Sequence, residues 1–222
     1  MRIEVLDDPA ARVAELLVET AAAGGDLVLT GGSSPKRAYE LAAAAGADWS
    51  GARVWYGDER CVPDDHEWSN HGMAEAALLS KLDPRPEVFR MEGELGPDAG
   101  ARNYEALIRE RLGDEPPWDL LLLGLGPDAH SASLFPGKPE VNVTDRLVVG
   151  VPEAGMEPQV PRISLTIPAI NAARHVVFLV TGESKREAVR RAFGDTPDMT
   201  SPAAHVRPRG ELTVYLDPAA AP

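Results

Sequence analysis

A histidine and an aspartate follow an apolar run near the middle of the chain and could form a proton-transfer pair. The run Leu120–Leu123 consists only of leucine, which predicts a central strand buried on both faces of a parallel sheet. In such sheets, ligands bind beyond the carboxyl ends of the strands. We therefore expect His130 to act as a general base and Asp128 to set its orientation or tautomer. The alternative is a histidine with a purely structural role.

The same loop contains signals for other chemistry. Gly124, Gly126 and Ala129 satisfy the dinucleotide fingerprint G-x-G-x-x-A, which requires a long helix to follow. A Pro-Gly pair soon interrupts that helix, so we do not expect a nucleotide site. A serine nucleophile at Ser131 or Ser133 would lack the G-x-S-x-G elbow.

A second loop, TGGSSP, follows a predicted strand and leads into a predicted helix. Gly31 and Gly32 would let the backbone approach a ligand closely, and the free amides at a helix start attract anions. A phosphate cradle that includes Ser33 is one interpretation. The other is an ordinary turn in which Ser33 or Ser34 is the N-cap. The spacing of a Walker A loop is missing.

A third loop, which begins with DERCVP, is long and polar, as functional loops in compact domains often are. We expect Arg60 to be held by neighbouring carboxylates while it presents a guanidinium fork to a phosphate; an ordinary surface ion pair is the alternative. His66 and His71 suggest zinc, but their spacing differs from H-E-x-x-H, so we expect no metal. Cys61 is a weak candidate nucleophile, because most lone cysteines are small packed residues.

Short apolar runs alternate with Ala-rich amphipathic segments, which predicts an α/β fold. We expect one domain over residues 1–222, with three layers and a mostly parallel central sheet between helices on both faces. The predicted strands are Ile3–Leu6, Leu27–Leu29, Val54–Tyr56, Val88–Arg90, Leu120–Leu123, Leu147–Val151, Ile163–Thr166, Val176–Val180 and Leu212–Leu216. The predicted helices are Pro9–Ala22, Pro35–Ala44, Asn70–Ser80, Pro97–Leu112 and Lys185–Phe193.

Composition limits the classes of partner. A formal net charge of -13 argues against binding to nucleic acid or to an anionic membrane, because both require a basic surface. An anionic small substrate must therefore meet locally placed arginine or lysine. The N-terminal residues lack the apolar core of a signal peptide, and no run is long enough for a membrane span. A single cysteine, Cys61, fits a reducing compartment, so we expect a cytoplasmic protein.

Four separated segments, taken together, resemble the 6-phosphogluconolactonase family and, more distantly, the glucosamine-6-phosphate isomerase/deaminases of the same fold. They are TGGSSP, DERCVP with the following SNHGM, GLGPDAHSASLFPG, and RISLTIPAINAARHVVFLVTGESK. ASLFPG resembles the lactonases, where deaminases have something like AFNEP, and DER replaces the DEY typical of deaminases. The resemblance implies a modified Rossmann-like fold and hydrolysis of 6-phospho-D-glucono-1,5-lactone to 6-phosphogluconate in the oxidative pentose phosphate pathway, without a cofactor.

The resemblance also implies roles for particular residues. His130 would be the general base and Asp128 its partner. The substrate would lie along Gly31, Gly32, Ser33 and Asp58, with Arg60 and also Arg162 binding its phosphate. Two alternatives stay open: an isomerase/deaminase acting on glucosamine 6-phosphate, and a non-catalytic sugar-phosphate sensor.

The chain departs from the family pattern at two places. Ala129 stands where relatives commonly have glycine, which matters if the backbone there needs a positive φ. The segment Glu153–Pro161 lacks the lysine of the Lys-Pro-Pro motif that helps relatives bind phosphate. We therefore expect phosphate binding to depend more on Arg60 and Arg162.

Overall fold

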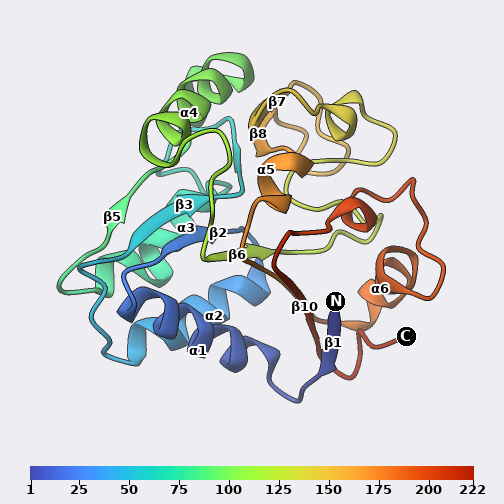
Figure 1. The fold of residues 1–222 in the computed structure, drawn as a ribbon, viewed down its shortest axis with the longest axis horizontal. Helices are drawn as coiled ribbons and strands as arrows, with labels where there is room; N and C mark the ends of the chain where they lie inside the picture. Colours follow the sequence, from blue (N-terminus) through green and yellow to red (C-terminus); the bar gives the residue numbers. More distant parts are fainter.

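The computed structural model describes residues 1–222, along which strands and helices alternate (Figure 1). The strands are β1 (Arg2–Val5), β2 (Asp26–Leu29), β3 (Arg53–Tyr56), β4 (Asp58–Arg60), β5 (Glu87–Val88), β6 (Leu120–Leu123), β7 (Val148–Val151), β8 (Arg162–Leu165), β9 (His175–Val180) and β10 (Glu211–Leu216). The helices are α1 (Pro9–Ala22), α2 (Ser33–Ala44), α3 (Asn70–Ala77), α4 (Pro97–Leu112), α5 (Ile167–Asn171) and α6 (Arg186–Phe193).

Most predicted elements are confirmed, and α1, α4 and β6 have the predicted bounds. Each of the two helices begins with a proline, whose missing amide would be unpaired at that position anyway. The predicted helix Asn70–Ser80 is too long, because α3 stops at Ala77 and a 3-10 turn, Leu79–Lys81, follows. The sequence analysis missed α5, which Thr166 caps by accepting a hydrogen bond from the Ala169 amide.

Seven strands form the main sheet, and all of them are parallel. Their order is β1-β10-β9-β6-β2-β3-β5. From β2 the chain proceeds to β3 on one side, whereas β6 leads to β9 on the other. The neighbours β2 and β6 therefore form a topological switch point, where the loops beyond their carboxyl ends diverge and leave a crevice.

A second sheet has three antiparallel strands in the order β4-β8-β7. The predicted strands at 147–151 and 163–166 belong to this sheet, so their expected place in a largely parallel sheet is wrong. The polar segment Asp58–Arg60, expected to be loop, is also a strand here, because it pairs with β8.

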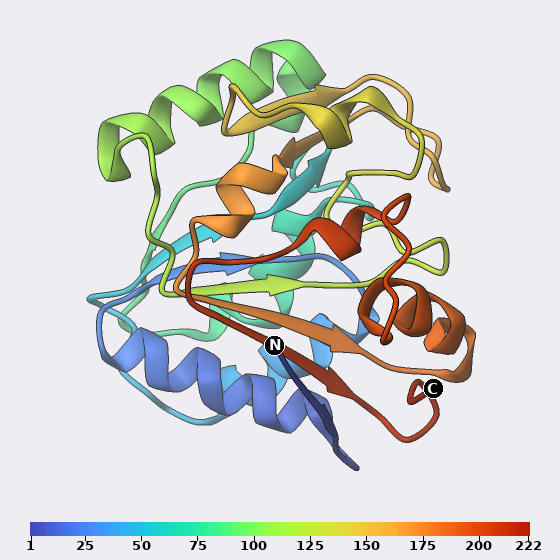
Figure 2. The same ribbon diagram turned by 45° about the vertical axis from the view of Figure 1, so that its right-hand side comes forward.

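The two faces of the main sheet are covered differently (Figure 2). Helices α1 and α2 lie side by side on one face. On the other face lie α5 and the second sheet, and α4 packs against the outside of β7 and β8. Near the carboxyl end of β9, Phe193 of α6 meets Phe178 edge to face, with 4.9 Å between ring centroids. The predicted three-layer α/β architecture is thus confirmed.

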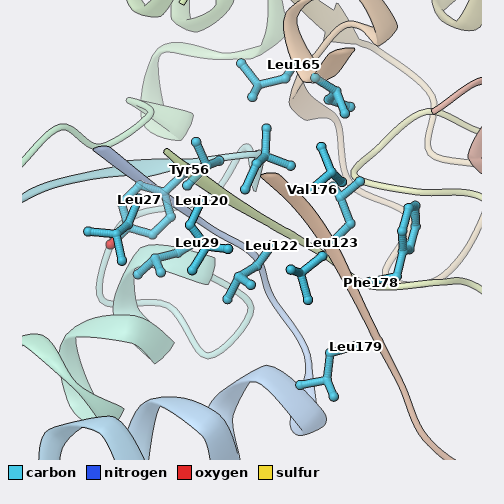
Figure 3. Close-up of a cluster of buried hydrophobic side chains, with 14 of the residues drawn as sticks. Leu27, Leu29, Tyr56, Leu120, Leu122, Leu123, Leu165, Val176, Phe178 and Leu179 are labelled. Atoms are coloured by element: carbon cyan, nitrogen blue, oxygen red, sulfur yellow. The ribbon is translucent and has the colours of Figure 1, made fainter. Parts of the chain in front are cut away.

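The core is one cluster of 61 buried hydrophobic residues, which supports a single domain. The four leucines of β6 lie at its centre, buried from both sides as their uniform sequence predicted (Figure 3). None of the helices combines the length and the apolar character that crossing a bilayer requires.

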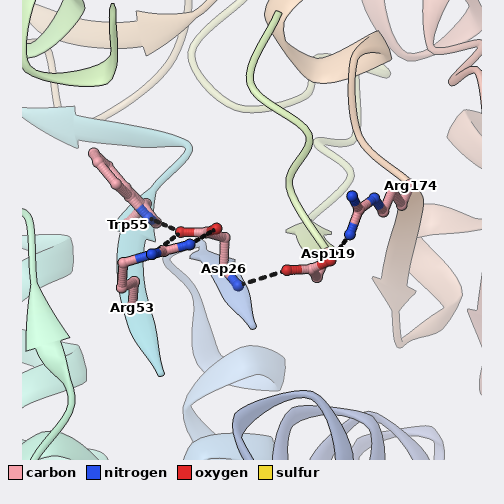
Figure 4. A network of polar contacts seen from close by, with 5 residues as sticks. All are labelled: Asp26, Arg53, Trp55, Asp119 and Arg174. Atoms are coloured by element: carbon pink, nitrogen blue, oxygen red, sulfur yellow. Dashed lines mark hydrogen bonds and ion pairs between the residues drawn. The ribbon is translucent and has the colours of Figure 1, made fainter. Parts of the chain in front are cut away.

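Polar contacts hold the amino ends of the central strands together (Figure 4). The buried Asp26 carboxylate accepts two hydrogen bonds from Arg53, at 2.8 and 2.5 Å, and one from the indole of Trp55 at 2.8 Å. Asp119 accepts from the Asp26 amide at 2.9 Å and from Arg174 at 2.5 Å. This network fixes the edge of the sheet opposite the loops that diverge at the switch point.

Candidate active site

A cleft of about 230 Å³ opens at the switch point, between the carboxyl ends of β2, β6 and β9 and the second sheet. The loops after β2 and β6 form one wall, and β4 and β8 contribute to the other. The cleft is lined by seven of the eight residues predicted from the sequence to form the site: Gly31, Gly32, Ser33, Asp58, Arg60, His130 and Arg162. The eighth, Asp128, contacts the ring of His130.

His130 and Asp128 form a hydrogen-bonded pair at the mouth of the β6 loop. The imidazole Nδ1 lies 2.6 Å from Asp128 Oδ1, which also accepts from the His130 amide at 3.1 Å. Burial raises the pKa of Asp128, but the hydrogen bond and the charge of His130 outweigh burial and bring this pKa below its ordinary value. An ionised carboxylate only accepts hydrogen bonds, so Nδ1 is the protonated nitrogen and Nε2 holds the free lone pair.

The backbone around His130 leaves little freedom to its ring. A Cβ at Gly126 would lie 2.0 Å from His130 Nδ1, so only glycine fits beneath the imidazole. The ring of Phe135 lies on the other side, 4.7 Å away between centroids. The buried Ala129 has a φ of 65°, so the positive φ considered from the sequence exists. Alanine tolerates it at a cost of about 1–2 kcal/mol.

The glycine loop approaches the cleft for a steric reason. A Cβ at Gly31 would meet Asn70 Oδ1 at 2.0 Å. Gly32 has a φ of 114° and is the N-cap of α2, with no side chain capping the helix, so the expectation of a Ser33 or Ser34 N-cap is wrong. Ser34 Oγ instead lies 2.5 Å from Thr181 Oγ1, beyond β9. The first amides of α2 therefore adjoin the cleft without a capping side chain.

Asp58 joins three parts of the site. Its carboxylate accepts a hydrogen bond from Ser133 Oγ at 2.7 Å and one from Asn70 Nδ2 at 3.1 Å, and its carbonyl accepts a second from Asn70 at 2.9 Å. The side chain is buried. Asp58 thus holds the β4 strand to the loop that contains His130 and to the residue that fits against Gly31.

Arg60 and Arg162 supply positive charge to the second wall. Arg60 Nη1 donates to the Trp68 carbonyl at 2.6 Å, and its buried Nε has no partner. The neighbouring carboxylates expected to hold Arg60 do not do so, because Glu59 turns to other donors. Burial, followed by the charge of Arg60, lowers the pKa of the Arg162 guanidinium. A bound anion would relieve this repulsion and the unpaired donor together.

The segment Glu153–Pro161, which lacks the family's lysine, orients Arg162 through its backbone. The guanidinium donates to the carbonyls of Pro158 at 2.9 Å and Val160 at 3.2 Å, with a longer contact to Met156 at 3.4 Å. Carbonyls hold the side chain without neutralising its charge, so the arginine still faces the cleft as a full cation.

Sequence reasoning missed two charged residues. Lys185 lines the cleft, where burial lowers the pKa of its ammonium and the charge of Asp128 opposes that change. Its place after β9, opposite the switch point, was the available signal. Glu59 is buried and accepts from the amides of Arg60, Asn70 and His71 at 2.7, 2.7 and 2.8 Å, which fixes the start of α3. Burial raises its pKa, and these amides oppose the rise.

The remaining candidate residues are occupied otherwise. His71 Nδ1 lies 2.9 Å from the hydroxyl of Tyr56, and His66 Nδ1 accepts from the amide of Trp68 at 3.1 Å. No group of three or more His, Cys, Asp or Glu side chains is arranged to hold a metal ion. Burial raises the pKa of the Cys61 thiol to about 11, which argues against a cysteine nucleophile.

Comparison with known proteins gives one family. The family model described as glucosamine-6-phosphate isomerases/6-phosphogluconolactonase matches residues 3–215. A 6-phosphogluconolactonase from Synechocystis is 40% identical over 87% of this chain and 82% of its own length. The solved 6-phosphogluconolactonase from Trypanosoma cruzi superposes with a TM-score of 0.86 at 30% identity, over 99% of this chain and 95% of that one.

A monomeric glucosamine-6-phosphate deaminase has the same fold, with a TM-score of 0.84 over 99% of this chain and 98% of that one. Its identity of 20% extends the likeness to the fold alone. The match to the family model and the identity to the relatives go further. The chain belongs to the glucosamine-6-phosphate isomerase/6-phosphogluconolactonase family.

Proposed function

We propose that this chain hydrolyses 6-phospho-D-glucono-1,5-lactone to 6-phosphogluconate, the lactone-opening step of the oxidative pentose phosphate pathway. One observation carries the proposal. His130, with its Nδ1 bonded to Asp128, shares a cleft with three cations that form no salt bridge, namely Arg60, Arg162 and Lys185. A base and an anion site in one cleft are what hydrolysis of a phosphorylated lactone requires.

The geometry supports a simple proton path. Asp128 keeps the proton of the neutral imidazole on Nδ1, so Nε2 accepts a proton from water as the water oxygen attacks the lactone carbonyl. The tetrahedral intermediate then expels the ring oxygen, which takes that proton from the imidazolium. Water adds across the C–O bond, and the acid formed ionises at neutral pH. Histidine serves as base and then as acid, as in other acyl transfers.

The second wall supports a phosphorylated substrate. The Arg60 Nε donor and the Arg162 guanidinium are buried cations in need of an acceptor, and phosphate oxygens bind such forks strongly. Uncapped amides at the start of α2 add an anion-binding surface beside Gly31 and Gly32. We also propose that the reaction takes place in the cytoplasm, where the one cysteine stays reduced.

A two-substrate assay tests the proposal. Purified protein receives freshly prepared 6-phosphogluconolactone in one arm and glucosamine 6-phosphate in the other, while acid release and ammonia release are followed. We expect acid release well above the spontaneous rate and no ammonia. Ammonia release would identify a deaminase. Binding of either compound without turnover would identify a sugar-phosphate sensor.

A further inference from the structure

The first strand leaves one edge of the main sheet open. β1 is the outermost strand beyond β10, and the opposite edge, β5, has only two residues (Figure 2). Three large apolar side chains are exposed at this edge: Met1 at 65%, Ile3 at 41% and Val5 at 52%. An edge strand with exposed apolar residues is a template for pairing with another strand.

The direction of the main-chain groups decides which residues can pair. The Leu6 amide donates to the Leu216 carbonyl at 2.8 Å, so Leu6 turns toward β10. In a strand, successive residues turn their N–H and C=O groups to opposite sides. Arg2 and Glu4 therefore face β10 as well, whereas Ile3 and Val5 turn theirs outward, where no strand pairs with them.

Charge then selects one register for pairing with a second copy. A two-fold axis at Ile3 places Ile3 opposite its equivalent as a hydrogen-bonded pair, because its amide and carbonyl point outward. The same register places Arg2 opposite Glu4 of the other copy, and Met1 opposite Val5. An axis at Arg2 or at Glu4 would place like charges directly opposite each other, which is unfavourable.

We infer that β1 is a homodimerisation strand, which pairs antiparallel with β1 of a second copy about Ile3 and so joins two main sheets into one. The strand has four residues, so the contact is smaller than the roughly 1,200 Å² of a stable interface, and the dimer is a weak, reversible one. β1 contributes no residue to the cleft, so dimerisation leaves hydrolysis unchanged.

Sedimentation velocity over a range of micromolar concentrations tests the interface. We expect the average mass of the wild type to rise from 23.7 kDa toward twice that value. Ile3→Lys places two ammonium groups at the two-fold axis and keeps the protein monomeric. Leu95→Lys, the same change at an apolar residue that is 46% exposed outside β1, leaves the dimer intact. A wild type that stays monomeric, or equal dissociation by both variants, would overturn the inference.

Charge exchange tests the register. Arg2→Glu and Glu4→Arg each place like charges across the proposed interface, so each should raise the dimer dissociation constant roughly tenfold. The double variant restores opposite charges and should dimerise like the wild type. If the single and double variants dimerise equally, the proposed register is wrong. Lactonase assays on all of these variants should give wild-type rates.

Discussion

Arg60 and Arg162 lie directly opposite each other on the antiparallel strands β4 and β8. Side chains of directly opposed residues leave a sheet on the same face, so both guanidinium groups reach the same cleft. Residues about 100 positions apart thus form one cationic wall because two short strands pair. The unneutralised charge of this wall is the basis for placing the substrate's phosphate there.

Replacing Arg60 should weaken substrate binding more than catalysis. A hydrogen bond to a charged group contributes about 1.5–3 kcal/mol, so Arg60→Ala should raise KM roughly 10- to 100-fold with little change in kcat. Arg146→Ala, at an exposed arginine outside the cleft, is the matched control and should have wild-type kinetics. An unaltered KM in Arg60→Ala would count against this residue as a phosphate ligand.

Asp128→Asn should affect both the rate and the response to acid. Without the carboxylate, the imidazole loses its preferred tautomer, and we expect kcat to fall by roughly 10²- to 10⁴-fold with KM nearly unchanged. The pKa of Asp128 is lowered by folding, so its stabilising effect is present above the unfolded pKa, about 3.9, and disappears as pH falls through the folded value.

Unfolding by urea at several pH values checks the second part. The wild type should lose more stability than Asp128→Asn as pH falls below about 4, because only the wild type has this carboxylate to protonate. Parallel pH curves for the two proteins would contradict the assigned role of the His130 contact.

Two glycines of the β6 loop should differ sharply when each is replaced by alanine. A Cβ at Gly126 would lie 2.0 Å from His130 Nδ1, whereas a Cβ at Gly124 meets nothing within 4 Å. Gly126→Ala should displace the imidazole, lower kcat and cost about 1–3 kcal/mol of unfolding free energy. Gly124→Ala should unfold like the wild type. Equal stability and kcat in both variants would mean that Gly126 does not position the ring.

The Cys61 thiol should be nearly inert. Because its pKa is about 11, at pH 8 it has roughly two orders of magnitude less thiolate than a free cysteine. Alkylation by iodoacetamide should be correspondingly slow in the folded protein and fast in urea. Cys61→Ser should keep full activity, and a large loss of kcat would revive Cys61 as a nucleophile.

Local sequence patterns predicted the long elements well, because they depend on local signals. The leucines of β6 and the proline that begins α4 are sufficient evidence in themselves. β4 could not be predicted in this way, because Asp58, Glu59 and Arg60 form a strand only through pairing with β8. For the same reason, apolar runs in the sequence do not reveal that β7 and β8 form a separate sheet.

The site was predicted where a residue follows a strand and missed where the tertiary fold alone brings it in. His130 follows β6 directly, so its position in the cleft could be expected. Lys185 lies on a turn that resembles a solvated helix start, and only the packing of α6 beside β9 turns it inward. The roles of Asn70 and Ser133 depend on contacts with Asp58 that no local pattern reveals.

The most direct test of the account is the lactonase kcat of His130→Ala, measured beside His66→Ala, a histidine outside the cleft. If the imidazole at position 130 transfers the proton from water, its removal should lower kcat by roughly 10²- to 10⁴-fold while the folded structure and the unfolding transition are preserved. His66→Ala should retain wild-type turnover. A His130→Ala variant that opens the lactone at the wild-type rate would contradict the proposed mechanism.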